Sequence, residues 1–147
     1  LDEPDRYARG GHGLYSSADD YFNFSEMLLT GKSQAGKQIV ELESLHLMTA
    51  KSISEKLLPI EIKHIDDQES INFFAPYSFG LGFRVKLDRI SDNDSNPGEF
   101  GWAGAACTFF LVDPKENLTA VIMTQTLNGN YYLKDIDFIN LIYSEIK

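Results

Sequence analysis

The chain has 147 residues. A chain of this length is enough for one domain, which buries roughly 70% of its unfolded surface. Hydrophobic residues make up 43% of the sequence and aromatic residues 12%, which excludes global disorder. The formal net charge is −9, and no Lys/Arg cluster offers a phosphate-binding stripe, so nucleic acid and anionic membrane surfaces are excluded as partners. No apolar run approaches the roughly 20 residues of a membrane-spanning helix.

The first predicted helix follows a polar, glycine-rich opening segment, residues 1–12. Ser17 can cap the helix, and the two Asp residues that follow shortly after it favour the positive end of the helix dipole. Gly31 is placed to end the helix. The apolar residues between them recur at helical spacing: Tyr21, Phe24, Met27 and Leu28.

A second helix is predicted over residues 40–50, although no capping residue marks its start. Its apolar residues share one face: Leu42, Leu45 and Met48. The segment 51–76 carries mixed charges and Pro59, and we interpret it as a loop with at most one short element.

Four strands and a last helix follow. Residues 79–87 alternate between apolar and other residues with a period of two, which predicts one strand. Residues 88–98 are acidic and rich in turn-forming residues. Three further strands are predicted at 99–103, 107–113 and 118–125, antiparallel because short turns join them. The apolar stripe of a helix over 133–146 is expected to pack onto one face of the sheet. The whole chain, 1–147, is therefore predicted to be a single α+β region, an antiparallel sheet flanked by helices.

Several stretches, in order, carry a family resemblance. They are residues 10–21, 27–31, 36–39 with 47–48, 77–83 and 102–125. Together they resemble the serine β-lactamase and penicillin-binding-protein superfamily, in its β-lactamase-related esterase branch, over residues 8–147. The resemblance implies a transpeptidase-like fold and a serine hydrolase that acts through an acyl-enzyme. It implies no metal and no organic cofactor.

Members of that superfamily use three motifs, of which the third lies on a strand that lines the active site. Trp102-Ala103-Gly104 resembles this third motif. Gly104 would let substrate approach the strand backbone closely. The resemblance further implies that the N–H of Ala105 is one donor of the oxyanion hole, where fixed donors stabilise developing negative charge.

Two departures from the family pattern bear on the substrate. Trp102 and Ala103 replace the cation and the hydroxyl that bind the carboxylate of penicillin-like substrates. This favours a small neutral ester, an amide or a peptide over a β-lactam. His12 falls where relatives place a residue that lines the substrate pocket, so the resemblance makes it a candidate for substrate contact.

The first two family motifs, Ser-x-x-Lys and Tyr-x-Asn, have no credible match. Residues 144–147 fit the first only at the extreme C-terminus, and residues 21–23 fit the second inside a helix where Tyr21 is better explained as core. We therefore expect the chain to be the C-terminal portion of a larger β-lactamase-like domain, inactive alone and partnered by the missing N-terminal part. An exposed docking face would permit self-association. Family resemblance favours a periplasmic or secreted location.

Other interpretations stay open. The chain could be a non-catalytic module of the same fold that binds peptide or cell-wall fragments, or an unrelated α+β domain. Trp102 could be a hydrophobic plug, Gly104 a turn glycine and His12 a surface histidine. Cys107, the single cysteine, is interpreted as an inert core thiol rather than a nucleophile, and it cannot form an internal disulfide. Residues 92–103 resemble half a calcium loop but lack its final Glu, and the histidines show no metal-ligand spacing.

Overall fold

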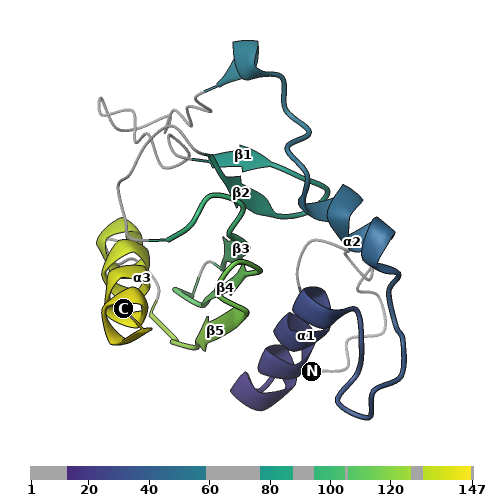
Figure 1. Cartoon of the computed structure of the whole chain (residues 1–147). Coiled ribbons are helices and arrows are strands. Elements are labelled where there is room, and N and C mark those ends of the chain that lie inside the picture. Colours follow the sequence, from purple (N-terminus) through teal and green to yellow (C-terminus); the bar gives the residue numbers. More distant parts are fainter. Residues whose placement is uncertain (1–12, 59–76, 88–94, 105, 127–130, 147) are drawn as a thin grey trace, which may run out of the picture.

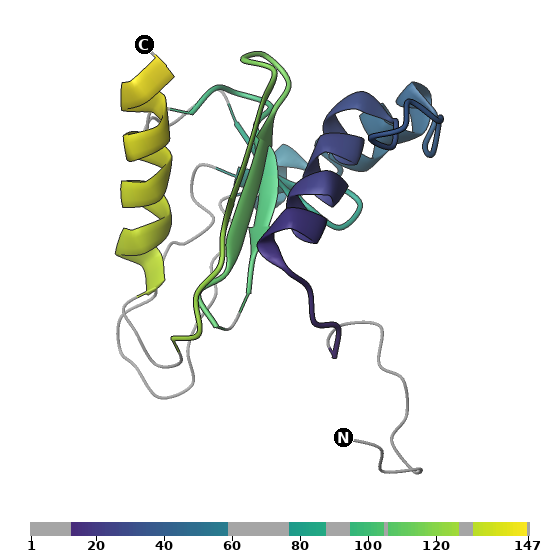
Figure 2. The same cartoon turned by 90° about the horizontal axis from the view of Figure 1, so that it is seen from below.

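The computed structural model describes residues 13–58, 77–87, 95–104, 106–126 and 131–146, with the backbone alone at residues 55 and 131–136. They form three layers (Figure 1). Seen along its edge, a β-sheet separates one helix, α3, from the helix α1 on the opposite face (Figure 2). We call these two faces of the sheet the α3 face and the α1 face. The predicted α+β architecture, an antiparallel sheet flanked by helices, is confirmed.

The sheet has five strands in the order β1-β2-β3-β4-β5, and every neighbouring pair is antiparallel. Their bounds are β1 Tyr77–Phe79, β2 Arg84–Lys86, β3 Phe100–Ala103, β4 Phe109–Asp113 and β5 Leu118–Ile122. Strand order follows chain order, so each connection joins neighbouring strands. The central strand β3 carries the residues that resemble the third motif.

Helix α1, Ala18–Thr30, begins and ends where the sequence predicts. The Ser17 hydroxyl accepts a hydrogen bond from the Asp20 N–H at 3.1 Å, which satisfies one of the free donors of the first turn. Gly31 ends the helix in a left-handed conformation with φ of 76°. The adjacent helix α2, Leu42–Thr49, has no side-chain cap, in line with the missing capping signal in the sequence.

Two apolar cores lie on the two faces of the sheet. On the α1 face, α1 and α2 contribute Leu28 and Leu45 to a core with strand residues that include Phe100 and Phe110. On the α3 face, helix α3, Tyr131–Ile146, contributes Ile139 and Tyr143 to a core with Phe109 and Leu111. The expected packing of the last helix onto the sheet is confirmed.

The single strand predicted over 79–87 is wrong, because the segment folds back as the β1–β2 hairpin. The Gly80 N–H donates to the Phe83 carbonyl at 2.8 Å, and Gly82 adopts a φ of 104° that side chains rarely allow. Gly80 and Gly82, which fit the period-two pattern of a continuous strand, therefore lie in the turn of the hairpin. Leu81, one of the apolar residues of the period-two pattern, is 61% exposed.

Among the helices of the described segments, none is long and apolar enough to cross a membrane.

Candidate functional site

Strand β3 ends at the motif-like residues. Trp102 is paired with Phe110 of β4, and Ala103 with Phe109. The Trp102 ring is 38% exposed and meets the Phe79 ring edge-on, with 5.2 Å between the ring centres. One aromatic surface at this end of the sheet is therefore accessible to a ligand, whereas Ala103, the next residue, packs against the core on the α3 face.

Two glycines of this strand region are explained by close contacts. A Cβ at Gly101 would collide with the Phe110 carbonyl oxygen of β4. A Cβ at Gly104 would collide with the Thr108 side-chain oxygen. Packing within the hairpin thus gives Gly104 a reason to be glycine, besides the close approach of substrate that the sequence suggests.

The connection from β3 to β4, residues 104–108, is a tight loop. The Gly104 N–H donates to the Thr108 carbonyl at 2.8 Å, and the Cys107 N–H donates to the Gly104 carbonyl at 3.0 Å. Cys107 adopts a φ of 56°, a conformation that glycine usually occupies and that costs another residue on the order of 1–2 kcal/mol. The β3–β4 loop is therefore strained next to the motif-like residues, and other contacts must hold it.

Those contacts come from the segment that follows β5. The Thr124 hydroxyl lies 2.5 Å from the Ala106 carbonyl oxygen and 3.0 Å from that of Cys107. The Thr126 N–H also donates to the Ala106 carbonyl, at 3.3 Å, and its own carbonyl accepts from the Cys107 thiol at 3.2 Å. The loop is thus tied to residues 124–126 by the carbonyl groups of Ala106 and Cys107 and by the Cys107 thiol.

Behind β3, on the α3 face, lies a buried charged cluster. Arg84 of β2 is opposite Gly101 and is 2% exposed. Its guanidinium carbon lies 4.4 Å from the centre of the Tyr77 ring and 4.6 Å from that of Phe109. Because Phe109 belongs to β4, the Arg84 side chain crosses over β3, where Gly101 presents no side chain.

Two carboxylates complete this cluster. Glu99, just before β3, is fully buried, and its Oε2 accepts from the Ser95 hydroxyl at 3.2 Å. Burial raises the pKa of Glu99, and Asp113 adds to this, while the charges of Arg84 and Lys86 and the Ser95 hydrogen bond act in the opposite direction.

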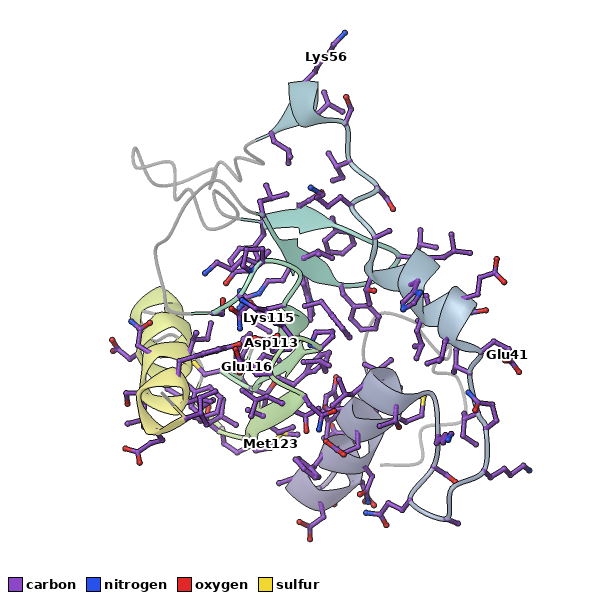
Figure 3. The ribbon with its side chains drawn as sticks, in the orientation of Figure 1. Glu41, Lys56, Asp113, Lys115, Glu116 and Met123 are labelled. Carbon is purple, nitrogen blue, oxygen red and sulfur yellow. The ribbon has the colours of Figure 1, made fainter. Side chains whose placement is uncertain are left out.

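Asp113 of β4 receives hydrogen bonds from three directions. Its Oδ2 accepts from the Tyr143 hydroxyl of α3 and from the Asn96 side-chain N–H at 2.8 Å. Its Oδ1 accepts from the Lys115 backbone N–H at 2.9 Å. Asp113, Lys115 and Glu116 gather at the β4–β5 turn (Figure 3). Burial, followed by the hydrogen bond to Asp113, raises the pKa of Tyr143 far above its ordinary value, so this phenol stays a donor.

The residues singled out in the sequence have different outcomes. Trp102, Ala103 and Gly104 lie together at the end of β3 and the start of the β3–β4 loop. His12 and Ala105 lie outside the described residues, so their expected roles stay predictions. Cys107 is buried, as a core thiol should be, but it lies in the loop before β4 rather than in the strand. Thr124 was not singled out, because it matches no motif and falls inside the strand predicted over 118–125, whereas β5 ends at Ile122.

The described segments contain no group of three or more His, Cys, Asp or Glu side chains that could hold a metal ion.

Comparisons with known proteins agree with an antiparallel sheet flanked by helices. The family model named Beta-lactamase matches residues 1–144, so the chain belongs to the Beta-lactamase family. Two curated relatives match equally well, Protein Rv1367c of Mycobacterium tuberculosis (strain ATCC 25618 / H37Rv) and the Uncharacterized protein MT1414 of strain CDC 1551 / Oshkosh. Each is 30% identical over 131 residues, which cover 83% of this chain and 30% of the relative.

Solved structures share the fold. EstCE1, described as a hydrolase with promiscuous acyltransferase activity, matches with a TM-score of 0.69 and 23% identity, over 94% of this chain and 33% of its own. The unliganded simvastatin synthase LovD from Aspergillus terreus matches with a TM-score of 0.67 and 22% identity, over 92% of this chain and 36% of its own. A β-lactamase (Mb2281c) from Mycobacterium bovis matches with a TM-score of 0.54 and 20% identity, over 84% of this chain and 40% of its own. The chain therefore spans about a third of the length of these proteins and shares a fold with esterases and acyltransferases.

Proposed function

We propose that the chain is the C-terminal part of a serine hydrolase that transfers acyl groups from a neutral ester, amide or peptide. The observation that carries this proposal is the position of Trp102-Ala103-Gly104 at the end of the central strand, beside a strained loop. Membership of the Beta-lactamase family and the fold shared with a hydrolase and a synthase support it.

In the proposed reaction, a serine in the remainder of the protein attacks the carbonyl carbon of the substrate and gives up its proton to a neighbouring base. The carbonyl oxygen becomes an oxyanion, which the N–H of Ala105 would stabilise together with a second donor. The bond to the alcohol or amine then breaks, and the leaving group takes the proton. Water attacks the acyl-enzyme in the same way, which releases the acid and restores the serine.

The part played by this chain is to shape the acyl side of the site. Trp102 carries no positive charge and Ala103 offers no hydroxyl, so an anionic carboxylate at this place would lose hydration without gaining a cation or a hydroxyl from these two residues. We therefore propose that uncharged substrates are preferred over β-lactams that carry a carboxylate. His12 is proposed to line the same pocket.

The test uses the full-length protein that contains this chain. Hydrolysis of p-nitrophenyl butyrate and of a penicillin is compared for the wild type, for Trp102→Ala and for the matched variant Phe22→Ala, since Phe22 on α1 is 42% exposed and distant in sequence. We expect ester hydrolysis to exceed penicillin hydrolysis, and Trp102→Ala alone to raise KM for the ester. Mass spectrometry should find the acyl group on a serine. Absence of any acyl-enzyme, with tight binding of peptide or cell-wall fragments, would replace the proposal by the non-catalytic module.

A further inference from the structure

The β3–β4 loop, residues 104–108, combines two features that call for an external support. Cys107 is held at a φ of 56°, which a non-glycine residue adopts only when its surroundings impose it. The loop also starts at the last residue of the Trp102-Ala103-Gly104 triplet, so its conformation fixes the backbone that follows the motif.

The support is concentrated on Thr124. Its hydroxyl lies within hydrogen-bond distance of two successive carbonyl oxygens, those of Ala106 and Cys107, at 2.5 and 3.0 Å. One hydroxyl proton shared between two successive carbonyls fixes the orientation of both peptide planes. These two carbonyls belong to the 106–107 and 107–108 peptides. The N–H of the first, that of Cys107, donates to the Gly104 carbonyl at 3.0 Å, and that carbonyl shares one peptide group with the N–H of Ala105. Thr126 adds its N–H to the Ala106 carbonyl at 3.3 Å.

We propose that Thr124 is a positioning residue, which orients the β3–β4 loop so that the backbone N–H after the motif can stabilise the oxyanion. This inference rests on the proposed function. Thr124 touches no reacting atom in this account. It acts through the carbonyl groups of Ala106 and Cys107. Without this support, Cys107 could leave its left-handed conformation, and the two carbonyl groups would not stay in place.

The sequence offers a matched pair of variants. Thr124→Val keeps the shape of the side chain and removes the hydroxyl, and Thr124→Ser keeps the hydroxyl. Thr119 of β5 is the control, because its half-buried hydroxyl also donates a hydrogen bond, to Glu26 Oε1 of α1, away from the loop. Thr119→Val therefore removes an equivalent bond from the same strand region without touching residues 106 and 107.

The first measurement is steady-state ester hydrolysis by the full-length variants. Removal of a whole oxyanion donor lowers kcat by about 10²–10³-fold. Thr124→Val should misorient the donor rather than remove it, so we expect kcat to fall about 10-fold or more with KM nearly unchanged. The kcat should recover in Thr124→Ser, and Thr119→Val should keep the wild-type kcat. A kcat for Thr124→Val close to that of the wild type would overturn the proposal.

The second measurement does not depend on activity. Cys107 is buried and its thiol donates to the Thr126 carbonyl, so its labelling by N-ethylmaleimide, followed on its own peptide by mass spectrometry, reports loop opening. We expect faster labelling in Thr124→Val than in Thr119→Val or the wild type. Unchanged labelling would show that the hydroxyl does not hold the loop. A third outcome is that Thr124→Val is labelled faster but the wild type hydrolyses none of the substrates. Thr124 would then support the loop, and both its role in catalysis and the proposed function would be overturned.

If Thr124→Val does not fold, Thr126→Pro takes its place. It removes the N–H that donates to Ala106, at an exposed position, and should change kcat and Cys107 labelling in the same direction by a smaller factor. Wild-type values for both would count against the proposal.

Discussion

The guanidinium carbon of Arg84 lies 4.6 Å from the centre of the Phe109 ring, although the two residues belong to strands that are separated by β3. The side chain of Arg84 reaches that ring by crossing over Gly101, whose own Cβ is excluded by the Phe110 carbonyl. One glycine therefore serves two purposes. It lets β3 and β4 approach, and it leaves room for a buried cation behind the strand that carries Trp102.

Replacing Arg84 by Met should be strongly destabilising, because Glu99 would lose an opposite charge while it stays buried. Loss of one partner of a direct buried ion pair costs about 3–5 kcal/mol, and the charge of Arg84 acts on Glu99 in the same sense. We expect the lower end of this range, since Lys86 also acts on Glu99. The measurement is chemical unfolding of the full-length protein.

The double variant Arg84→Met with Glu99→Gln is the decisive control for this pair. It removes both charges, so it should recover a large part of the lost stability. Lys115→Met, at an exposed Lys whose Nζ donates to the Asn96 side chain, should change the free energy of unfolding by less than about 1 kcal/mol. Strictly additive effects of the two single changes would contradict coupling between Arg84 and Glu99.

The free energy of unfolding should depend on pH through Glu99. Burial raises its folded-state pKa above the ordinary value of 4.5. Between these two values the folded state binds more protons than the unfolded state, so this contribution to stability is fully present below 4.5 and is lost as the pH rises through the folded-state pKa. Urea unfolding of the full-length protein across this window should show the decline, and Glu99→Gln should flatten it.

The exposed Glu41 provides the comparison for this pH dependence. Its side chain caps no helix N–H and points away from the sheet (Figure 3). Glu41→Gln should therefore keep the wild-type pH profile. A Glu99→Gln profile as steep as that of the wild type would assign the decline to another group.

Tyr143→Phe should destabilise the contact between α3 and the sheet. The variant keeps the ring in the core but takes a donor from the buried Asp113, and such a loss costs about 1–3 kcal/mol. Ser144→Ala is the control, because the Ser144 hydroxyl donates only to the Leu141 carbonyl on the exposed side of the same helix. Equal midpoints of unfolding for these two variants would show that the Tyr143 bond contributes nothing measurable.

Local signals in the sequence predicted much of the fold. Ser17 and Gly31 bracket α1 because capping and left-handed termination depend on single residues. The antiparallel strands after residue 98 followed from short apolar runs joined by turns. The β1–β2 hairpin was missed, because its turn glycines, Gly80 and Gly82, fall on the same period as a continuous strand.

Contacts between distant segments were beyond the reach of such signals. In the sequence, Arg84 and Lys86 alternate with apolar residues, a pattern equally typical of a solvated strand face, yet both are buried. The support of the β3–β4 loop by Thr124 joins residues 17 and 18 positions apart. The motif-like Trp102 to Gly104 was located because a family pattern, rather than periodicity, marks it.

Gly101→Ala should damage the central strand by steric conflict alone. Gly101 does not adopt a left-handed φ, and its added methyl group would meet the backbone oxygen of Phe110, which cannot move without breaking the β3–β4 pairing. We expect loss of about 1–3 kcal/mol or failure to fold. Gly36→Ala tests backbone strain without steric conflict, because Gly36 has a φ of 76° but open space around its missing Cβ. It should lose only about 1 kcal/mol of backbone strain. Urea unfolding of both full-length variants checks this order of stability, and a Gly101→Ala protein more stable than Gly36→Ala would contradict the close approach of β3 and β4.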